Sequence, residues 1–214
     1  MYPSTTLAER RADGLVHAVG LTFALVGGGV LIVLAASRLD PLLILACGIY
    51  AATLALSFGA SACYHMLPWH RARPGLRRLD HAAIYGLIAG TFTPLLIHIG
   101  TGWSHAVLAA TWALALPAML YKIFGTSIDT RWSVLSYLGL GWMGMLALPQ
   151  LASHLSATAL GALVAGGLTY SLGTIFYARR SMRFRYAIWH GFVLVGTAAL
   201  FVAVTLTLLP APPA

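Results

Sequence analysis

Polar residues that could perform chemistry stand on both sides of one short loop, in the stretch from Ser61 to Asp80. The sequence SACYH, which ends at His65, closes a long apolar run, and Asp80 opens the next one. Further along the chain, Tyr186 and His190 stand at the beginning of the last apolar run. Polar side chains at the ends of apolar segments predict a polar site at one end of a helix bundle.

Spacing arranges these residues in pairs. Ser61 and His65 are four positions apart, so they lie on one face of their helix. Tyr186 and His190 repeat this spacing, and two facing helices could present both pairs to a shared centre. Histidine suits zinc as a neutral nitrogen ligand, and Ser61 could hold a carboxylate or a water molecule by a hydrogen bond. Asp80 could act as a general base or as a hydrogen-bond partner of a ligand.

Structural interpretations of the same residues remain open. Asp80 could be only the N-cap of the third helix, stabilised by the helix dipole and by Arg77 or Arg78. His65 and His190 could anchor their helices at the interface or form an interhelical hydrogen bond. His17, in the opening turn of the first apolar run, could likewise be structural.

The elements that must position these residues are membrane helices. The chain of 214 residues is 59% hydrophobic and 8% charged, whereas a soluble domain has about 25% charged residues. After a polar arm at 1–13, seven apolar segments follow, each near the ~20 residues that cross a bilayer. Because no loop is long enough for a separate domain, we expect residues 1–214 to form one all-α, seven-transmembrane-helix bundle. The expected spans are about 14–36, 41–65, 80–99, 104–124, 132–150, 158–178 and 186–209.

The distribution of charge predicts the orientation of the bundle. Of the 13 Lys and Arg residues, all but Arg38 fall in the N-terminal arm and in the loops on its side. The positive-inside rule therefore places the N-terminus in the cytoplasm and the C-terminus outside. Since the net charge of +8 lies in short loops between spans, we read it as this topology signal and expect no nucleic-acid partner. With this orientation the candidate residues all lie at the cytoplasmic end: His17, Ser61, Tyr64, His65, Asp80, Tyr186 and His190.

At these residues the chain resembles the hemolysin III family, the bacterial branch related to the progestin and adipoQ receptors. Both belong to a wider superfamily that includes alkaline ceramidases. The resemblance implies a seven-helix, multi-pass protein of a bacterial plasma (inner) membrane, with its N-terminus inside and a zinc site near the cytoplasmic face. The matching stretches run in order over nearly the whole chain: HAVG at 17–20, SACYH at 61–65, LDHAAIYGLIAGTFTP at 79–94, GGLTYSLGTIFYARR at 166–180 and AIWHGFVLVG at 187–196.

The resemblance also implies which residues form the site. The family pattern has one histidine on the second helix and an HxxxH pair on the seventh, with a serine and an aspartate nearby. His65 matches the first histidine and His190 matches the last. Ser61 and Asp80 match the serine and the aspartate, which makes them the candidate catalytic residues beside a zinc ion.

One position departs from this pattern. Tyr186 stands where the first histidine of the HxxxH pair is expected, which leaves two histidine ligands instead of the three of a catalytic zinc site. Tyr186 could bind as a phenolate, His17 or His81 could substitute, water could complete the shell, or the site could be metal-free. Leu200 stands near the place of a further expected histidine.

Three functions are compatible with these residues, all with membrane lipids as partners. The first is a zinc-dependent hydrolase of a lipid amide or ester, with Asp80 taking a proton from water and the substrate entering from the bilayer. The second is a non-catalytic protein that senses or adjusts the state of the membrane, which the tyrosine at position 186 favours. The third is a pore-forming haemolysin, which is favoured least because no amphipathic secreted segment is visible.

Overall fold

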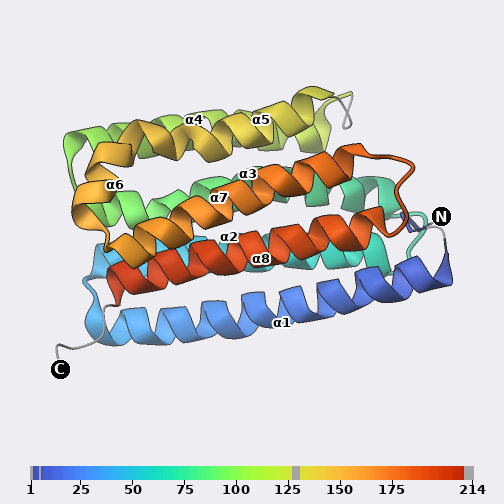
Figure 1. The fold of residues 1–214 in the computed structure, drawn as a ribbon, viewed down its shortest axis with the longest axis horizontal. Helices are drawn as coiled ribbons and strands as arrows, with labels where there is room; N and C mark the ends of the chain where they lie inside the picture. Colours follow the sequence, from blue (N-terminus) through green and yellow to red (C-terminus); the bar gives the residue numbers. More distant parts are fainter. Residues whose placement is uncertain (1, 5, 127–130, 210–214) are drawn as a thin grey trace.

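A computed structural model describes residues 2–4, 6–126 and 131–209, and these residues contain helices but no strand. Seven helical segments are long and apolar enough to cross a membrane, which confirms the expected all-α, seven-helix membrane fold. The fifth of these, Ser133–His154, is built from three shorter helices. The elements are α1 (Leu7–Arg38), α2 (Pro41–Met66), α3 (Arg73–Ile99), α4 (Gly102–Phe124), α5 (Arg131–Gly141), the 3-10 helix η1 (Trp142–Ala147), α6 (Leu148–His154), α7 (Ala157–Ala178) and α8 (Arg185–Leu208) (Figure 1).

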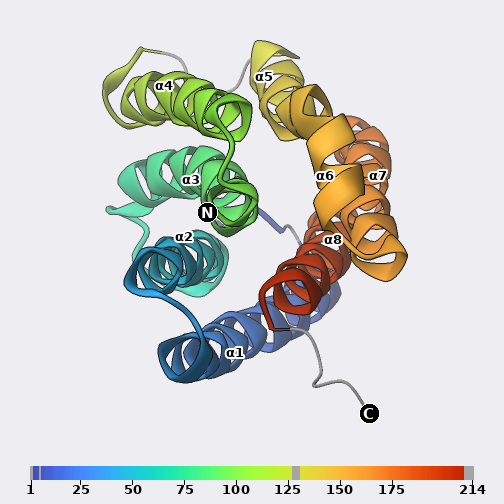
Figure 2. The same ribbon diagram turned by 90° about the vertical axis from the view of Figure 1, so that its left-hand side faces the viewer.

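The helices form a ring when the bundle is viewed from its end (Figure 2). Helices that follow one another in the sequence are neighbours, and the ring continues where α1 packs against α8. Helix α3 is the most enclosed of the spans, because 78% of its most apolar window is buried, against 17–33% in the other six. It contacts α2, α4, α5 and α8. The element order therefore brings the first, second and last spans together on one side of α3.

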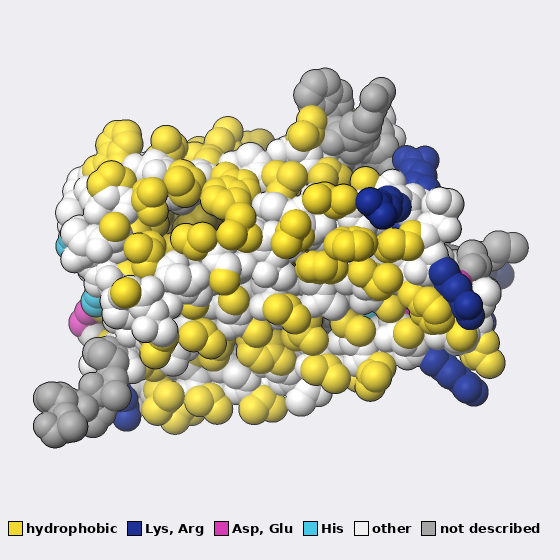
Figure 3. All heavy atoms as spheres, viewed as in Figure 1, with side chains coloured by type: hydrophobic (Ala, Val, Ile, Leu, Met, Phe, Trp, Pro, Cys, Tyr) yellow, Lys and Arg dark blue, Asp and Glu magenta, His cyan; other side chains and the backbone are white. Residues whose placement is uncertain are grey.

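The outer surface has the distribution of a membrane protein. Figure 3 shows hydrophobic side chains over the middle of the bundle and most of the visible basic side chains at the end where α1 begins. A broad apolar belt is what a bilayer-facing surface requires, since lipid tails cannot hydrogen-bond polar groups.

The first helix begins earlier than the hydropathy pattern predicted. The expected span started at about residue 14, but α1 starts at Leu7 because Thr6 and Glu9 form a capping box there. The first turns of α1 are therefore polar. As a consequence Asp13, which we assigned to the polar arm, lies on the helix one turn before His17 and is fully buried.

The third helix also begins earlier than expected. Helix α3 starts at Arg73 with Ala72 as its N-cap and with Pro74 in its first turn, where proline is well tolerated. The interpretation of Asp80 as the N-cap of this helix is therefore wrong, because Asp80 lies two turns inside it. Arg78, which we considered as a partner of Asp80, instead donates hydrogen bonds to the main-chain oxygens at the end of α4, including that of Gly125 at 2.7 Å.

The fifth span is interrupted where it passes α3. Helix α5 gives way to the 3-10 turn η1 and then to α6. Within η1, a Cβ added to Gly144 would lie 2.5 Å from Cε1 of Phe92 on α3. Proline at position 149, in the first turn of α6, also disfavours a continuous helix. The span thus bends where its backbone approaches an aromatic ring.

Close contact between α2 and α3 depends on Gly90. A Cβ built at Gly90 would lie 3.0 Å from Cβ of Thr53 and would overlap its Oγ1. The Thr53 hydroxyl is not free to turn away without losing its hydrogen bond to the Tyr50 main-chain oxygen, at 2.9 Å. Small residues allow this kind of close approach between membrane helices.

We therefore expect Gly90→Ala to lower the free energy of unfolding by about 1–3 kcal/mol, the usual cost of overpacking a well-packed interior. Thermal unfolding in detergent would measure it. Gly29→Ala is the matched control, because Gly29 is exposed on α1 and its added Cβ meets no atom within 4 Å. Thr53→Ala should recover part of the loss in the Gly90→Ala background. A Gly90→Ala protein as stable as the control would contradict this account.

The beginning of α8 is tied to the beginning of α1. Phe184, the N-cap of α8, has a φ of 58°, a left-handed conformation that is rare for a residue with a bulky side chain. Its main-chain N–H donates to Oε1 of Glu9 at 3.1 Å. The other carboxylate oxygen of Glu9 accepts the N–H of Thr6 at 3.0 Å. One side chain thus serves two helix N-termini.

We expect Glu9→Ala to destabilise the protein by about 1.5–3 kcal/mol, the range for hydrogen bonds to a charged group, and to speed hydrogen exchange at the Phe184 amide. Glu9→Gln keeps an acceptor oxygen and should retain part of the protection. Exchange at Phe184 that is equally slow in the wild type and in Glu9→Ala would show that Glu9 does not hold α8.

Candidate metal centre

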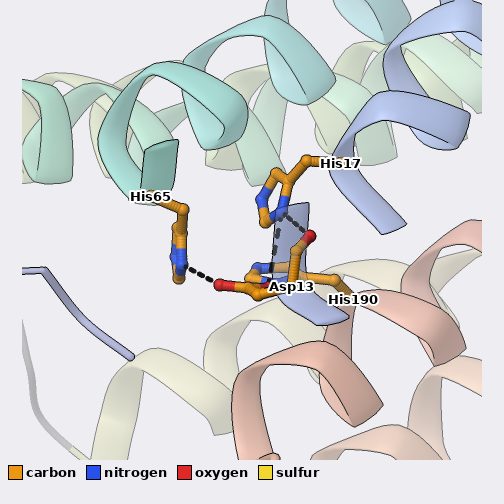
Figure 4. A group of neighbouring side chains, drawn as sticks. All are labelled: Asp13, His17, His65 and His190. Carbon is orange, nitrogen blue, oxygen red and sulfur yellow. Dashed lines mark hydrogen bonds and ion pairs between the residues drawn. The ribbon is translucent and has the colours of Figure 1, made fainter. Parts of the chain in front are cut away.

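Four titratable side chains meet at the end of the bundle where α1 begins (Figure 4). Asp13 and His17 come from α1, His65 from α2 and His190 from α8. One ligand atom from each of the four lies within 4.8 Å of the others. This end is the one that the positive-inside rule assigned to the cytoplasm.

The helix arrangement explains why these residues meet. Asp13 and His17 are one turn apart on α1, which packs between α2 and α8. The three imidazole rings touch one another, with ring centroids 5.0 Å apart for His17 and His65, 4.3 Å for His17 and His190, and 4.5 Å for His65 and His190.

The carboxylate of Asp13 is the centre of the hydrogen-bond network. Its Oδ2 lies 2.9 Å from Nδ1 of His65, and its Oδ1 lies 2.8 Å from Nδ1 of His190. The Asp13 main-chain oxygen lies 2.7 Å from Nδ1 of His17. Asp13 is 0% exposed, and a carboxylate buried this deeply requires donors to offset its lost hydration.

These contacts determine which histidine nitrogens remain available. Carboxylate and carbonyl oxygens only accept hydrogen bonds, so the Nδ1 atoms of His17, His65 and His190 are the donors to Asp13. In a neutral imidazole the other nitrogen, Nε2, then carries a lone pair. The arrangement repeats the way in which metal-binding histidines are usually oriented, with one ring nitrogen on a carboxylate or carbonyl and the other on the metal.

Ser61, predicted as a site residue, lies beside these nitrogens. Its Oγ is 3.2 Å from Nε2 of His17 and 3.5 Å from Nε2 of His190. The structure therefore brings Ser61, His65 and His190 together, as the sequence spacing suggested, and adds His17 to them. A hydroxyl placed between two Nε2 atoms can donate to one of them or to a bound group.

Tyr186 lies next to the centre. Its ring packs edge-on against His65, with centroids 5.2 Å apart, and its hydroxyl accepts a hydrogen bond from Arg185 at 2.7 Å. His81, the other substitute that we considered, is not a member of the four-residue cluster. The donor set of the cluster is thus completed by His17 and Asp13.

Asp80 lies apart from the cluster, on the wall of a cavity that both share. The cavity has a volume of about 770 Å³, and His17, His65 and His190 are among the residues that line it. Leu200, at the position of a further expected histidine, is one of its apolar lining residues. The lining continues with apolar side chains from α3, η1, α7 and α8, among them Leu87, Phe92, Met145, Leu163 and Val193.

The cavity extends toward the surface between the fifth span and α7. Trp142 and Ser171 both line it, and the Trp142 Nε1–H donates to the Ser171 hydroxyl at 3.1 Å. Figure 3 shows the apolar surface hollowed between these two elements. A mostly apolar cavity with a few polar groups at one end is typical of a small-molecule site.

Asp13 was not among the predicted site residues, although the sequence contains a signal for it. Asp13 and His17 are four positions apart, the same spacing that drew attention to Ser61 and His65. The donor set of three imidazoles and one carboxylate fits zinc and other first-row divalent metals. The cluster of Asp13, His17, His65 and His190 could therefore hold a metal ion.

Comparisons with known proteins cover nearly the whole chain. Residues 6–201 match the family described as "Haemolysin-III related". The chain is 34% identical over 200 residues to the "Hemolysin-3 homolog" of Bacillus subtilis (strain 168), covering 93% of this chain and 94% of that protein. It is 33% identical over 203 residues to "Hemolysin-3" of Bacillus cereus, covering 94% and 93%.

A more distant similarity extends to animals. The chain is 26% identical over 209 residues to the human "Monocyte to macrophage differentiation factor", covering 93% of this chain and 84% of that protein. With the seven apolar helices, these matches confirm the resemblance drawn from the sequence motifs. This chain is a multi-pass membrane protein that belongs to the haemolysin-III related family.

Proposed function

We propose that this protein is a zinc-dependent hydrolase of a membrane lipid amide or ester, located in a bacterial inner membrane with its N-terminus in the cytoplasm. One observation carries the proposal. Three imidazoles, those of His17, His65 and His190, line a mostly apolar cavity of about 770 Å³, and the buried Asp13 carboxylate lies behind two of them. A polar donor set beside an apolar cavity suits a substrate that has a polar head and a long apolar chain.

In this proposal His17, His65 and His190 would hold the zinc ion through Nε2. His17 would supply the third imidazole, because position 186 holds a tyrosine where the family pattern has a histidine. Asp13 orients all three rings through their Nδ1 atoms. Three histidine ligands would leave a position open, as catalytic zinc sites do. A bound zinc ion supplies Lewis-acid chemistry, polarising a carbonyl group and making water a better nucleophile at neutral pH.

The remaining steps are assigned to Asp80 and Ser61. The Asp80 carboxylate lines the cavity and is half-buried. Among the residues that the structure describes it has no hydrogen-bond donor, so it can accept a proton from the attacking water and pass it to the leaving group. The Ser61 hydroxyl, between two imidazoles, can hold the water or the substrate carbonyl in place.

The cavity would hold the acyl chain. Its walls are mainly aliphatic and aromatic, and transfer of each CH2 group from water to such surroundings is worth about 0.8 kcal/mol. Entry between the fifth span and α7 would let the acyl chain of the lipid pass from the bilayer into the cavity without crossing water. Membrane lipids are therefore the proposed partners.

Metal content is the first test. Protein purified in detergent without chelators and then offered zinc should hold about one zinc ion per chain, as counted by mass spectrometry. Each of His17→Ala, His65→Ala and His190→Ala should lose it, because two imidazoles are too few to retain zinc. Tyr186→Phe is the matched control and should keep the metal.

Two results would count against this assignment. A well-folded wild type that takes up no metal would remove the basis of the hydrolase. If Tyr186→Phe loses zinc while His17→Ala keeps it, the third zinc ligand is the phenolate of Tyr186 and not His17.

Activity on ceramide-like and phospholipid substrates is the second test. Asp80→Asn should lower kcat by roughly 10²–10⁴-fold, the usual contribution of a general base, and should leave the zinc content unchanged. If metal-replete wild type leaves every substrate intact while a known hydrolase cleaves it, the protein is not this kind of enzyme. A membrane-sensing role would then be the better-supported function. In that case the Asp80→Asn protein should complement a deletion strain fully.

A further inference from the structure

A short arm precedes α1 and reaches the metal centre. Residues 2–4 lie at the end of the bundle where α1 begins (Figure 1), and in the end-on view they project inside the ring of helices (Figure 2). Ser4 is 7% exposed. The arm therefore covers the cluster from the side that we assign to the cytoplasm.

The arm is anchored through the ring of Tyr2. The guanidinium carbon of Arg10, on α1, lies 4.4 Å from the ring centroid, and that of Arg73, at the start of α3, lies 4.6 Å from it. The His70 ring meets Tyr2 edge-on, with centroids 5.2 Å apart. Arg73 is itself held by a hydrogen bond to the Leu67 main-chain oxygen at 2.6 Å. Contacts from two helices and the α2–α3 loop thus fix the arm in place.

The anchored arm delivers one hydroxyl group to Asp13. The Ser4 Oγ–H donates to Oδ2 of Asp13 at 3.2 Å. The same oxygen accepts the hydrogen bond from Nδ1 of His65. A carboxylate can rotate over a broad range about its last side-chain bond, so a second donor on Oδ2 restricts the plane of the group. That plane determines how well both oxygens meet the imidazoles.

We propose that Ser4 is a positioning residue of the metal centre, which acts on the metal through Asp13. This inference rests on the metal site proposed above. The Ser4 hydroxyl holds the Asp13 carboxylate in the orientation that directs the His65 and His190 rings. The arm at residues 2–4 is thus a component of the site, although none of its side chains is a metal ligand.

Cobalt substitution tests the proposal without an activity assay. The visible absorption of bound Co²⁺ reports the number and arrangement of its ligands, and transfer to a chelator reports how firmly it is held. Ser4→Ala should change the spectrum and raise the Kd for the metal roughly two- to tenfold, the range that one hydrogen bond contributes. Ser4→Thr keeps the hydroxyl and should restore both values. Tyr2→Leu, which weakens the anchor, should speed metal loss to the chelator.

Ser37→Ala is the matched control, because Ser37 is an exposed serine near the far end of α1. A Ser4→Ala protein with the spectrum and Kd of this control would overturn the inference. So would a Ser4→Thr protein that behaves as Ser4→Ala does. Wild type that binds no Co²⁺ or Zn²⁺ would overturn the metal site and this inference together, whereas metal binding that is indifferent to Ser4 would overturn this inference alone.

Discussion

The end of the bundle where α1 begins depends on a single buried carboxylate. Asp13 is removed from water, and a charge in such surroundings is tolerated only when it is paired and hydrogen-bonded. Its donors come from three helices, so α1, α2 and α8 must keep their relative positions for the carboxylate to remain satisfied. Glu9, one turn earlier on α1, fixes the start of α8 in the same way. Two acidic side chains thus set the packing of three membrane spans.

The fold was accessible from the sequence because the bilayer imposes it. A span must be apolar for about 20 residues and must satisfy its own backbone, so composition and the lengths of the apolar runs were enough to predict seven helices. Helix ends were predicted less well, because hydropathy marks where a helix enters lipid. The polar first turns of α1 and α3 are set by local signals, the Thr6–Glu9 capping box and Pro74.

That distinction explains which residues of the candidate metal centre were predicted. Ser61, His65 and His190 were found because their spacing and position were visible along the chain. Asp13 was not, because an acidic residue outside the apolar run reads as part of a polar arm. His17 was one of several alternatives for the third ligand, and the sequence could not choose among them because it does not show that α1 packs between α2 and α8. Of the two histidines considered as substitutes for a ligand at position 186, the structure brings His17 into the cluster and leaves His81 out of it.

The interrupted fifth span divides the molecule into two parts with different mechanical properties. The helices that carry Asp13, His17, His65 and His190 are continuous and lie on one side of α3, whereas the segment with the 3-10 turn lies on the other side and borders the cavity. A break in the main-chain hydrogen-bond ladder makes bending easy at that place. Bending of the fifth span would therefore widen the cavity on that side without moving the helices that carry the four-residue cluster. In the proposed function, access for a lipid and the positions of the metal-binding side chains would thus be assigned to separate walls of the same ring.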